Sequence, residues 1–353
     1  MSDAPCTPIA AAHPAGDLTN DPTLARQTRR TFGHDVAVEA SYLRDSVGVV
    51  DLGWRDLLAV NGADALSFLH RMLTQDFNTL APGASRRSAL LVRKGQLVAE
   101  FLATRPAEAT PDEVVWFSVS SGRAAALAGG LDPFVITEDV VFRPLDATHT
   151  TIWLVGPRAV ELHAAAGSPS AVRHDLGALP GMLLRLTHAA ARDLWPTLGT
   201  LAGGMGGGFA GFDAFEMVRI EQGLGRYGVD WDDQVLPKEA GLDDCISYTK
   251  GCFVGQEPTA RLHFRGQPAR RLMRLTIAGT TPLPVLPPPG TPLTDAAGKE
   301  AGVLTSVAWS SAQGIGVALG YVKRAHIDAD PPVALRVGDG NGAEVTITNR
   351  PPA

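Results

Sequence analysis

The sequence predicts an α+β protein of three domains, the last of which is a small β-barrel. The chain has 353 residues, whereas a single domain usually has about 100–200. Strand-like and helix-like segments alternate between residues 37 and 201, as in mixed domains. Short strand-like runs at 271–277, 302–308, 315–321, 334–337 and 344–348 lie around a Pro-dense boundary at 282–292, and they are enough for a small barrel.

Composition excludes several classes of protein. The net charge is −6 and only 19% of residues are charged, which argues against a mainly electrostatic nucleic-acid binder. Hydrophobic residues make up 45% of the chain, too many for wholesale disorder. No apolar run reaches the roughly 20 residues of a membrane-spanning helix. Three cysteines cannot form a disulfide framework or a four-thiolate metal site, which favours a reducing compartment. We therefore expect a cytoplasmic protein without a bound metal. We also expect a monomer without membrane contact.

The N-terminal half divides into a tail and one α+β domain. Residues 1–36 show no sustained periodicity and are predicted to be a loose tail. Residues 37–150 form the first domain: strands at 47–51, 57–60, 114–119 and 137–142, a hairpin of 88–92 with 97–102, and helices at 64–73 and 123–131. Apolar positions 3.6 residues apart identify the first helix, and Lys94-Gly95 supplies the hairpin turn.

The second domain is expected at residues 151–211, with a strand at 151–155 and helices at 158–166 and 193–201. The glycine-rich run 203–211 lacks the ending of a phosphate-binding loop, so we interpret it as a flexible connector. An amphipathic helix at 212–223 begins the segment 212–266, which completes the first domain. Residues 267–353 form the barrel.

One segment, residues 219–266, concentrates reactive side chains. Gly251 and Gly255 bracket Cys252, and Lys250 lies two residues before it. A nearby cation and a helix beginning at Val254 would both favour the thiolate form of the cysteine. The alternative is that Cys252 is a buried small hydrophobic residue and Lys250 a solvated surface charge. The chemistry of these residues alone does not decide between the two interpretations.

The run KGCFVGQE at 250–257, continued by ARLHFRG, resembles the signature of the YgfZ family, folate-binding relatives of glycine-cleavage T-protein that support iron–sulfur protein maturation. Similar blocks occur in order at 49–76, 219–223, 236–244 and 316–324. The resemblance therefore covers residues 37–324. It implies a T-protein-like ring of three domains around a channel that admits tetrahydrofolate, with the signature cysteine facing the channel.

The resemblance also implies roles for individual residues. Cys252 is expected to be the reactive group and Lys250 to lower its pKa. Arg219, Glu221, Gln256, Glu257 and Arg261 are candidate contacts to the folate. A carboxylate such as Glu221 can accept from the amino-pyrimidine edge of a pterin, and an arginine such as Arg261 can bind a glutamate tail. For Glu216 with Arg219, an intrahelical ion pair is the favoured interpretation.

Departures from T-protein determine the functional hypothesis. Transferases of that family carry an aspartate pair where this chain has Ala99 and Glu100, and one added methylene displaces the carboxylate. We therefore expect a tetrahydrofolate-binding accessory factor for iron–sulfur protein maturation or repair, with iron–sulfur assembly or client proteins as partners. The alternative is a tetrahydrofolate-dependent aminomethyl or one-carbon transferase.

Two weaker features remain. Arg261, Arg265, Arg270 and Arg271 form a local basic cluster that could contact tRNA or a partner protein, which is a third hypothesis. Asp230, Asp232 and Asp233 surround Trp231; a polar loop that orders this segment is favoured there over a cation site.

Overall fold

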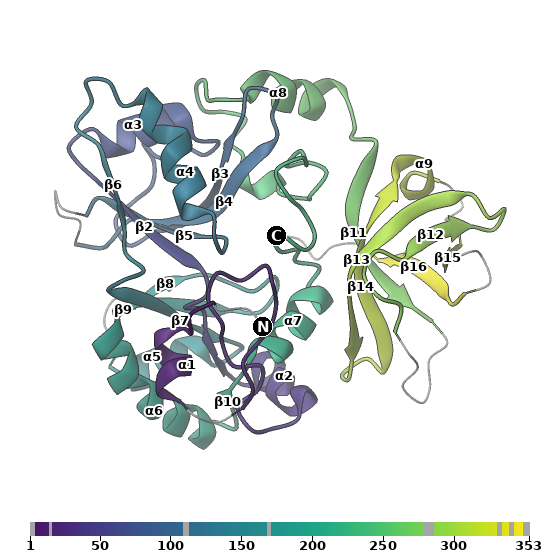
Figure 1. The fold of residues 1–353 in the computed structure, drawn as a ribbon, viewed down its shortest axis with the longest axis horizontal. Helices are drawn as coiled ribbons and strands as arrows, with labels where there is room; N and C mark the ends of the chain where they lie inside the picture. The colour runs from purple at the N-terminus through teal and green to yellow at the C-terminus, as the bar shows by residue number, and fades with distance from the viewer. Residues whose placement is uncertain are drawn as a thin grey trace.

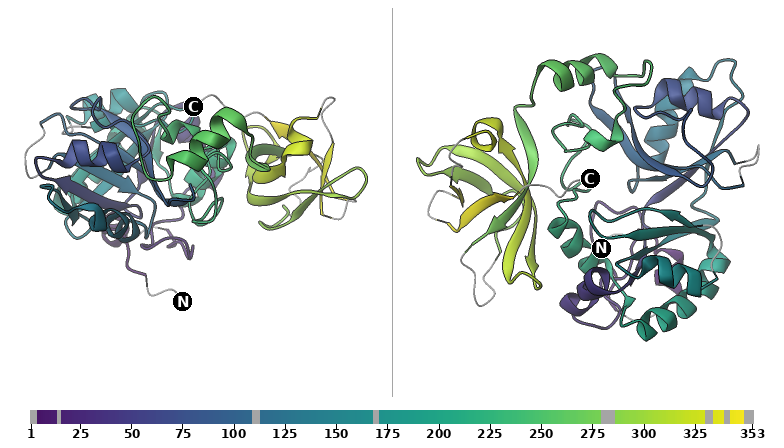
Figure 2. Two further views of the ribbon diagram at one scale, coloured as in Figure 1. Left: turned by 90° about the horizontal axis from the view of Figure 1, so that it is seen from above. Right: turned by 180° about the vertical axis from the view of Figure 1, so that it is seen from behind.

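The computed structural model describes residues 4–13, 16–108, 113–167, 171–278, 286–329, 334–338 and 342–348. Two α+β bodies and a β-barrel surround a common centre (Figure 1), and the barrel lies to one side of both (Figure 2). This arrangement confirms the predicted fold class. Among the described residues, no helix is long and apolar enough to cross a membrane.

The first body is a five-stranded sheet with two helices against it. The strand order is β3-β4-β5-β2-β6. The elements are β2 (Asp56–Asn61), α3 (Ala65–Met72), β3 (Ser85–Leu91), β4 (Leu97–Thr104), β5 (Val115–Val119), α4 (Ala124–Leu131), the 3-10 turn η1 (Asp132–Phe134) and β6 (Val141–Pro144). The predicted hairpin is confirmed, because β3 pairs antiparallel with β4. Helix α3 buries Phe68, Leu69 and Met72 on one face, as its 3.6-residue spacing predicts.

The second body has the strand order β10-β1-β7-β9-β8. Its elements are α1 (Pro8–Ala12), α2 (Val36–Asp45), β1 (Gly48–Asp51), β7 (His149–Val155), α5 (Ala159–Ala165), β8 (Ala171–Arg173), β9 (Gly181–Thr187), α6 (His188–Gly204), β10 (Gly208–Phe209) and α7 (Phe212–Glu221). Because β1 pairs with β7 and β10, the predicted boundary that places 37–150 in one domain is wrong for β1. Sequence spacing cannot show which of two sheets a short buried strand joins.

The predicted loose tail is also different in the structure. Ile9 is buried against the second sheet, and the hydroxyl groups of Thr7 and Thr28 donate to the buried carboxylate of Asp51. Arg26 forms ion pairs with Asp56 and Asp146. The described part of the tail is therefore a packed segment, held by long-range polar contacts that periodicity does not reveal.

The glycine-rich run is not a flexible connector. Gly208 and Phe209 form β10 and pair parallel with β1. A Cβ on Gly207 would lie 2.1 Å from the carbonyl oxygen of Val47, and one on Gly208 would lie 2.8 Å from the ring of Tyr42. Glycine is required at 207 because its backbone lies against that of Val47, and at 208 because the Tyr42 ring occupies the space of a side chain.

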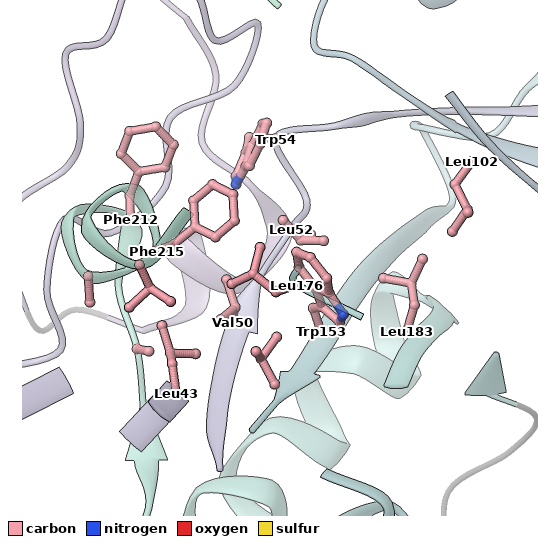
Figure 3. Packing of buried hydrophobic residues seen from close by; sticks show 14 of the residues in the cluster. Leu43, Val50, Leu52, Trp54, Leu102, Trp153, Leu176, Leu183, Phe212 and Phe215 are labelled. Carbon is pink, nitrogen blue, oxygen red and sulfur yellow. The ribbon is translucent and has the colours of Figure 1, made fainter. Parts of the chain in front are cut away.

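The two bodies share a hydrophobic core with α7. Trp54, Trp153, Phe212 and Phe215 pack together where the sheets meet, and Leu102 of the first sheet extends toward Leu183 of the second (Figure 3). The following segment, which contains η2 (Asp243–Cys245) and α8 (Gln256–Arg265), packs against β3 and β4 of the first body.

The C-terminal body is a closed barrel with the strand order β11-β14-β13-β12-β15-β16. Its elements are β11 (Arg270–Ile277), β12 (Pro292–Asp295), β13 (Glu300–Ser310), β14 (Ile315–Lys323), α9 (Arg324–Ile327), β15 (Leu335–Val337) and β16 (Glu344–Thr348). The predicted barrel is confirmed. Part of the Pro-dense boundary at 282–292 lies outside the described residues.

Candidate functional site

A central cavity lies between the two sheets and the loop that follows α7. Its volume is about 110 Å³, counted as the space open to the centre of a water molecule. Leu102, Trp153 and Phe215 contribute apolar walls, while Glu100 and Arg55 contribute charge. A mostly apolar cavity with a few polar groups is the usual form of a small-molecule site.

Arg219 of α7 joins three parts of the protein beside this cavity. Its Nε and one Nη donate to both carboxylate oxygens of Glu216, each at 2.7 Å. The remaining donors reach Leu224 O at 3.0 Å, Asp230 Oδ2 at 2.9 Å and Ser306 Oγ at 3.0 Å. The predicted intrahelical pair with Glu216 is confirmed. Because all five donors of the guanidinium are used within the protein, Arg219 has none left for the predicted folate contact.

Asp230 is the second centre of this buried polar cluster, which consists of Glu216, Arg219, Asp230 and Ser306 and is called the hub below. Its side chain is buried and accepts from Arg219, from the Arg226 backbone N–H and from the hydroxyl groups of Thr305 and Ser306 in the barrel. The favoured interpretation of the acidic loop as an ordering element agrees with these contacts. Within the described part of the chain, no group of three or more His, Cys, Asp or Glu residues could hold a metal ion.

Glu221, the predicted acceptor for a pterin, is engaged elsewhere. It is 4% exposed, and both of its carboxylate oxygens accept from Nη1 of Arg44 at 3.0–3.1 Å. This ion pair ties α2 to α7, and Glu221 is not among the residues that line the cavity. These contacts give Glu221 a structural role, because both oxygens already have a cationic partner, and its contact to a pterin stays a prediction.

Two carboxylates among the described residues line the cavity, Glu100 and Asp175; Asp175 accepts from Arg173 and from the Gly181 backbone N–H, whereas Glu100 has acceptor capacity left. Glu100 lies on β4 and accepts from Nε and Nη2 of Arg87 at 3.2 and 3.0 Å, both on Oε1. Its Oε2 accepts only a long hydrogen bond from Ser120, at 3.3 Å. Burial favours the neutral form, but Arg87 and Arg55 outweigh it and hold the pKa of Glu100 below its usual value. The group is therefore an ionised carboxylate with spare acceptor capacity.

Trp231 forms another part of the wall, and its indole N–H is buried without a hydrogen-bond partner. Buried donors are normally satisfied, so an unsatisfied one beside a cavity marks a place for a ligand acceptor or water. Gly225 makes this position possible, since a Cβ there would lie 2.1 Å from the Trp231 ring.

Lys250 and Cys252 lie apart from the cavity. Nζ of Lys250 donates to the backbone carbonyls of His70, Leu73 and Gln75 around the C-terminus of α3. Such carbonyls lack helical partners and favour a cation. Burial lowers the pKa of Lys250 to about 8. Lys250 therefore caps a helix, which is a role that neither sequence interpretation included.

Cys252 is exposed and borders a shallow surface hollow with His70 and Arg71. It is not among the residues that line the central cavity, in contrast to the channel-facing position that the resemblance implies. Helix α8 begins at Gln256, two residues later than predicted, with Gly255 before it at φ +77°. Cys252 is thus four residues from the helix and gains little from its N-terminus.

The remaining predicted contacts lie on α8. Gln256 is half-buried, whereas Glu257 and Arg261 are exposed, and none of the three lines the cavity. Their ligand-binding roles stay predictions. In the basic cluster, Arg270 and Arg271 lie 3.8 and 3.6 Å from carboxylates of Glu239 and Asp243, which reduces its net charge.

Sequence reasoning missed most of the cavity wall. Arg55, Arg87, Trp153 and Trp231 come from four separate segments, so no local motif groups them. The sequence pointed to two residues that do line the cavity: Glu100, in the altered aspartate position, and Arg219.

Comparison with known proteins identifies the family. Residues 18–175 match the GCVT N-terminal domain, and residues 270–352 match the glycine cleavage T-protein C-terminal barrel domain. Together the matches cover well over half of the chain. The chain belongs to the T-protein-like family.

Individual T-protein-like relatives match over most of their length. The chain is 24% identical to an aminomethyltransferase of Chloroherpeton thalassium, with 86% of each chain covered. It is 27% identical to an aminomethyltransferase of Rubrobacter xylanophilus, with 90% of this chain and 83% of the relative covered. The crystal structure of glycine cleavage system aminomethyltransferase T from Bartonella henselae superposes with a TM-score of 0.85 at 23% identity, covering 99% and 98% of the two chains. That likeness supports the fold.

Proposed function

We propose that this T-protein-like chain binds tetrahydrofolate in the central cavity and takes part in one-carbon transfer of the aminomethyltransferase type. Aminomethyltransferases of this family use tetrahydrofolate as substrate or cofactor, and the relatives described above carry that activity in their names. The one observation that carries the proposal is the ionised Glu100 on the cavity wall, at the position of the family's aspartate pair.

The residues present fit a reduced folate. A pterin has flat faces that stack on aromatic rings, and Trp153 and Trp231 line the cavity. Its edge has both donors and acceptors, which match the carboxylate of Glu100 and the unsatisfied N–H of Trp231. The bound folate would supply the nitrogen atoms that carry the one-carbon unit. Glu100 would accept a hydrogen bond from a folate N–H or stabilise positive charge beside it.

A calorimetric titration with tetrahydrofolate tests the binding, and conversion of a one-carbon donor to methylenetetrahydrofolate tests the transfer. We expect Glu100→Gln to weaken binding by about tenfold, the effect of one charge-assisted hydrogen bond, and to abolish transfer. The matched control is Glu161→Gln, because Glu161 is exposed in a surface ion pair with Arg158. Absence of tetrahydrofolate binding by the wild type would refute the proposal.

The accessory role in iron–sulfur protein maturation is a second candidate, favoured by the exposed thiol of Cys252. A thiol on the surface is accessible to a client protein, as such a role requires. Cys252→Ala would then fail to restore iron–sulfur enzyme activities in a strain that lacks the endogenous factor. The control is Cys245→Ala, which removes a buried thiol and should restore these activities. Full restoration by Cys252→Ala would remove this candidate.

A further inference from the structure

Four arginines line the central cavity, and their ion pairing differs. Three have carboxylate partners within 4 Å among the described residues: Arg87 with Glu100 and Asp244, Arg219 with Glu216 and Asp230, and Arg226 with Asp21 and Glu216. Arg55 has none in the same part of the chain. Arg55 is half-buried, and charged side chains that are partly withdrawn from water are usually paired, because an uncompensated charge is costly there.

The hydrogen bonds of Arg55 leave donors unused. Its Nε donates to Ser118 Oγ and its Nη2 to Ser118 O, both at 3.0 Å. Both acceptors are neutral, and no described residue accepts from Nη1. A guanidinium has five N–H donors in a fixed plane, so the two contacts to Ser118 orient the group while the others remain available.

Nearby groups add to the positive potential. Burial lowers the pKa of the Arg55 guanidinium, which nevertheless stays charged at neutral pH. Burial, reinforced by Arg55 and Arg87, lowers the pKa of His174 to about 3, so this histidine is neutral and stacks on Trp153 with ring centroids 4.8 Å apart. This side of the cavity therefore has an arginine charge that no carboxylate of the described residues contacts.

We propose that Arg55 binds a carboxylate group of a ligand in the central cavity. A carboxylate offers two acceptor oxygens that match the unused donors of the guanidinium, and it would place a negative charge in direct contact with Arg55, which Glu100 and Asp56 stabilise only from beyond ion-pair distance. The carboxylate has two possible sources: the glutamate of a folate, or a separate small carboxylic acid bound beside a pterin. Only the first source rests on the proposed function.

Calorimetry on the full-length protein distinguishes the sources with three probes: tetrahydrofolate, tetrahydrobiopterin, which has a pterin but no carboxylate, and sodium acetate in a buffer free of other carboxylates. Arg55→Gln is expected to weaken binding of the carboxylate-bearing probe by at least about tenfold. Arg55→Lys keeps the charge without the planar fork, so a smaller loss is expected. Arg324→Gln is the matched control, because Arg324 pairs with Asp328 at the exposed end of the barrel.

The outcomes separate clearly. Weaker tetrahydrofolate binding with unchanged tetrahydrobiopterin binding supports a folate carboxylate, and loss of acetate binding alone supports a small acid. If the wild type binds no folate, the proposed function fails while the acetate titration still tests Arg55. Three results would overturn the inference. The first is an Arg55→Gln variant with wild-type affinities, the second is an equal loss for both pterins without acetate binding, and the third is a wild type that binds none of the probes.

Discussion

The central cavity and the loop around Cys252 differ in how their charged groups are held. Around the cavity, Arg219 and Asp230 are buried and connect α7 with the barrel. In the loop, Lys250 caps one helix and Cys252 is exposed. The loop carries the recognisable motif, whereas the cavity has the enclosed surface and the unsatisfied donors that a small ligand requires. A conspicuous motif and a ligand site therefore need not coincide, and four experiments test this contrast.

The largest effect is expected at the hub. Arg219→Met would leave the carboxylates of Glu216 and Asp230 without their main partner, which typically costs about 3–5 kcal/mol. Urea unfolding followed by circular dichroism measures this loss. Arg158→Gln, which breaks an exposed pair with Glu161, should change the unfolding free energy by less than about 1 kcal/mol. If Arg219→Met changed the unfolding free energy as little as Arg158→Gln does, the buried contacts of Arg219 would not stabilise the fold as we expect.

Gly225→Ala tests the packing of the cavity wall. The added Cβ would meet the Trp231 ring at 2.1 Å, so the indole must move, at a cost of about 1–3 kcal/mol. The change in Trp fluorescence and the unfolding free energy are the measurements. Gly203→Ala is the control, because Gly203 lies in α6 with nothing within 4 Å of its added Cβ; it should stabilise the protein by up to about 1 kcal/mol. Similar behaviour of the two variants would argue against a tightly packed wall.

The Lys250 cap is expected to show in a titration. Because burial lowers the pKa of Lys250 to about 8, the folded protein releases this proton at lower pH than the unfolded chain, whose lysine pKa is about 10.4. The unfolded state then binds more protons between these values, so this group makes stability rise with pH across that window. NMR of the lysine side chains should give a midpoint near pH 8 that is absent in Lys250→Arg. A midpoint above pH 10 would contradict burial of the ammonium.

The smallest effect on stability is expected at Cys252. Since its side chain is exposed, Cys252→Ala should change the unfolding free energy by less than about 0.5 kcal/mol. A thiol reagent should label Cys252 in the native protein, whereas Cys245, which is fully buried, should react only after unfolding. Slow native labelling of Cys252 would show that the loop is more enclosed than the structure has it.

The sequence by itself determined the elements with strong local patterns. Helix α3, the β3–β4 hairpin and the barrel strands follow from apolar spacing and turn residues, which act between near neighbours. The motif around Cys252 and the family resemblance also followed from local residue order. The ion pair of Glu216 with Arg219 also followed from local order, because a pair three residues apart on a helix is a local contact.

The tertiary structure alone decided which sheet β1 joins, the packing of the N-terminal segment, and the partners of Glu221 and Lys250. Each depends on contacts between residues far apart in sequence, such as Arg44 with Glu221 and Lys250 with the end of α3. The same is true of the cavity, where Arg55, Glu100 and Trp231 converge from separate segments. Local order gives no distance between such groups, and only burial and spatial proximity determine which charges are paired and which remain available to a ligand.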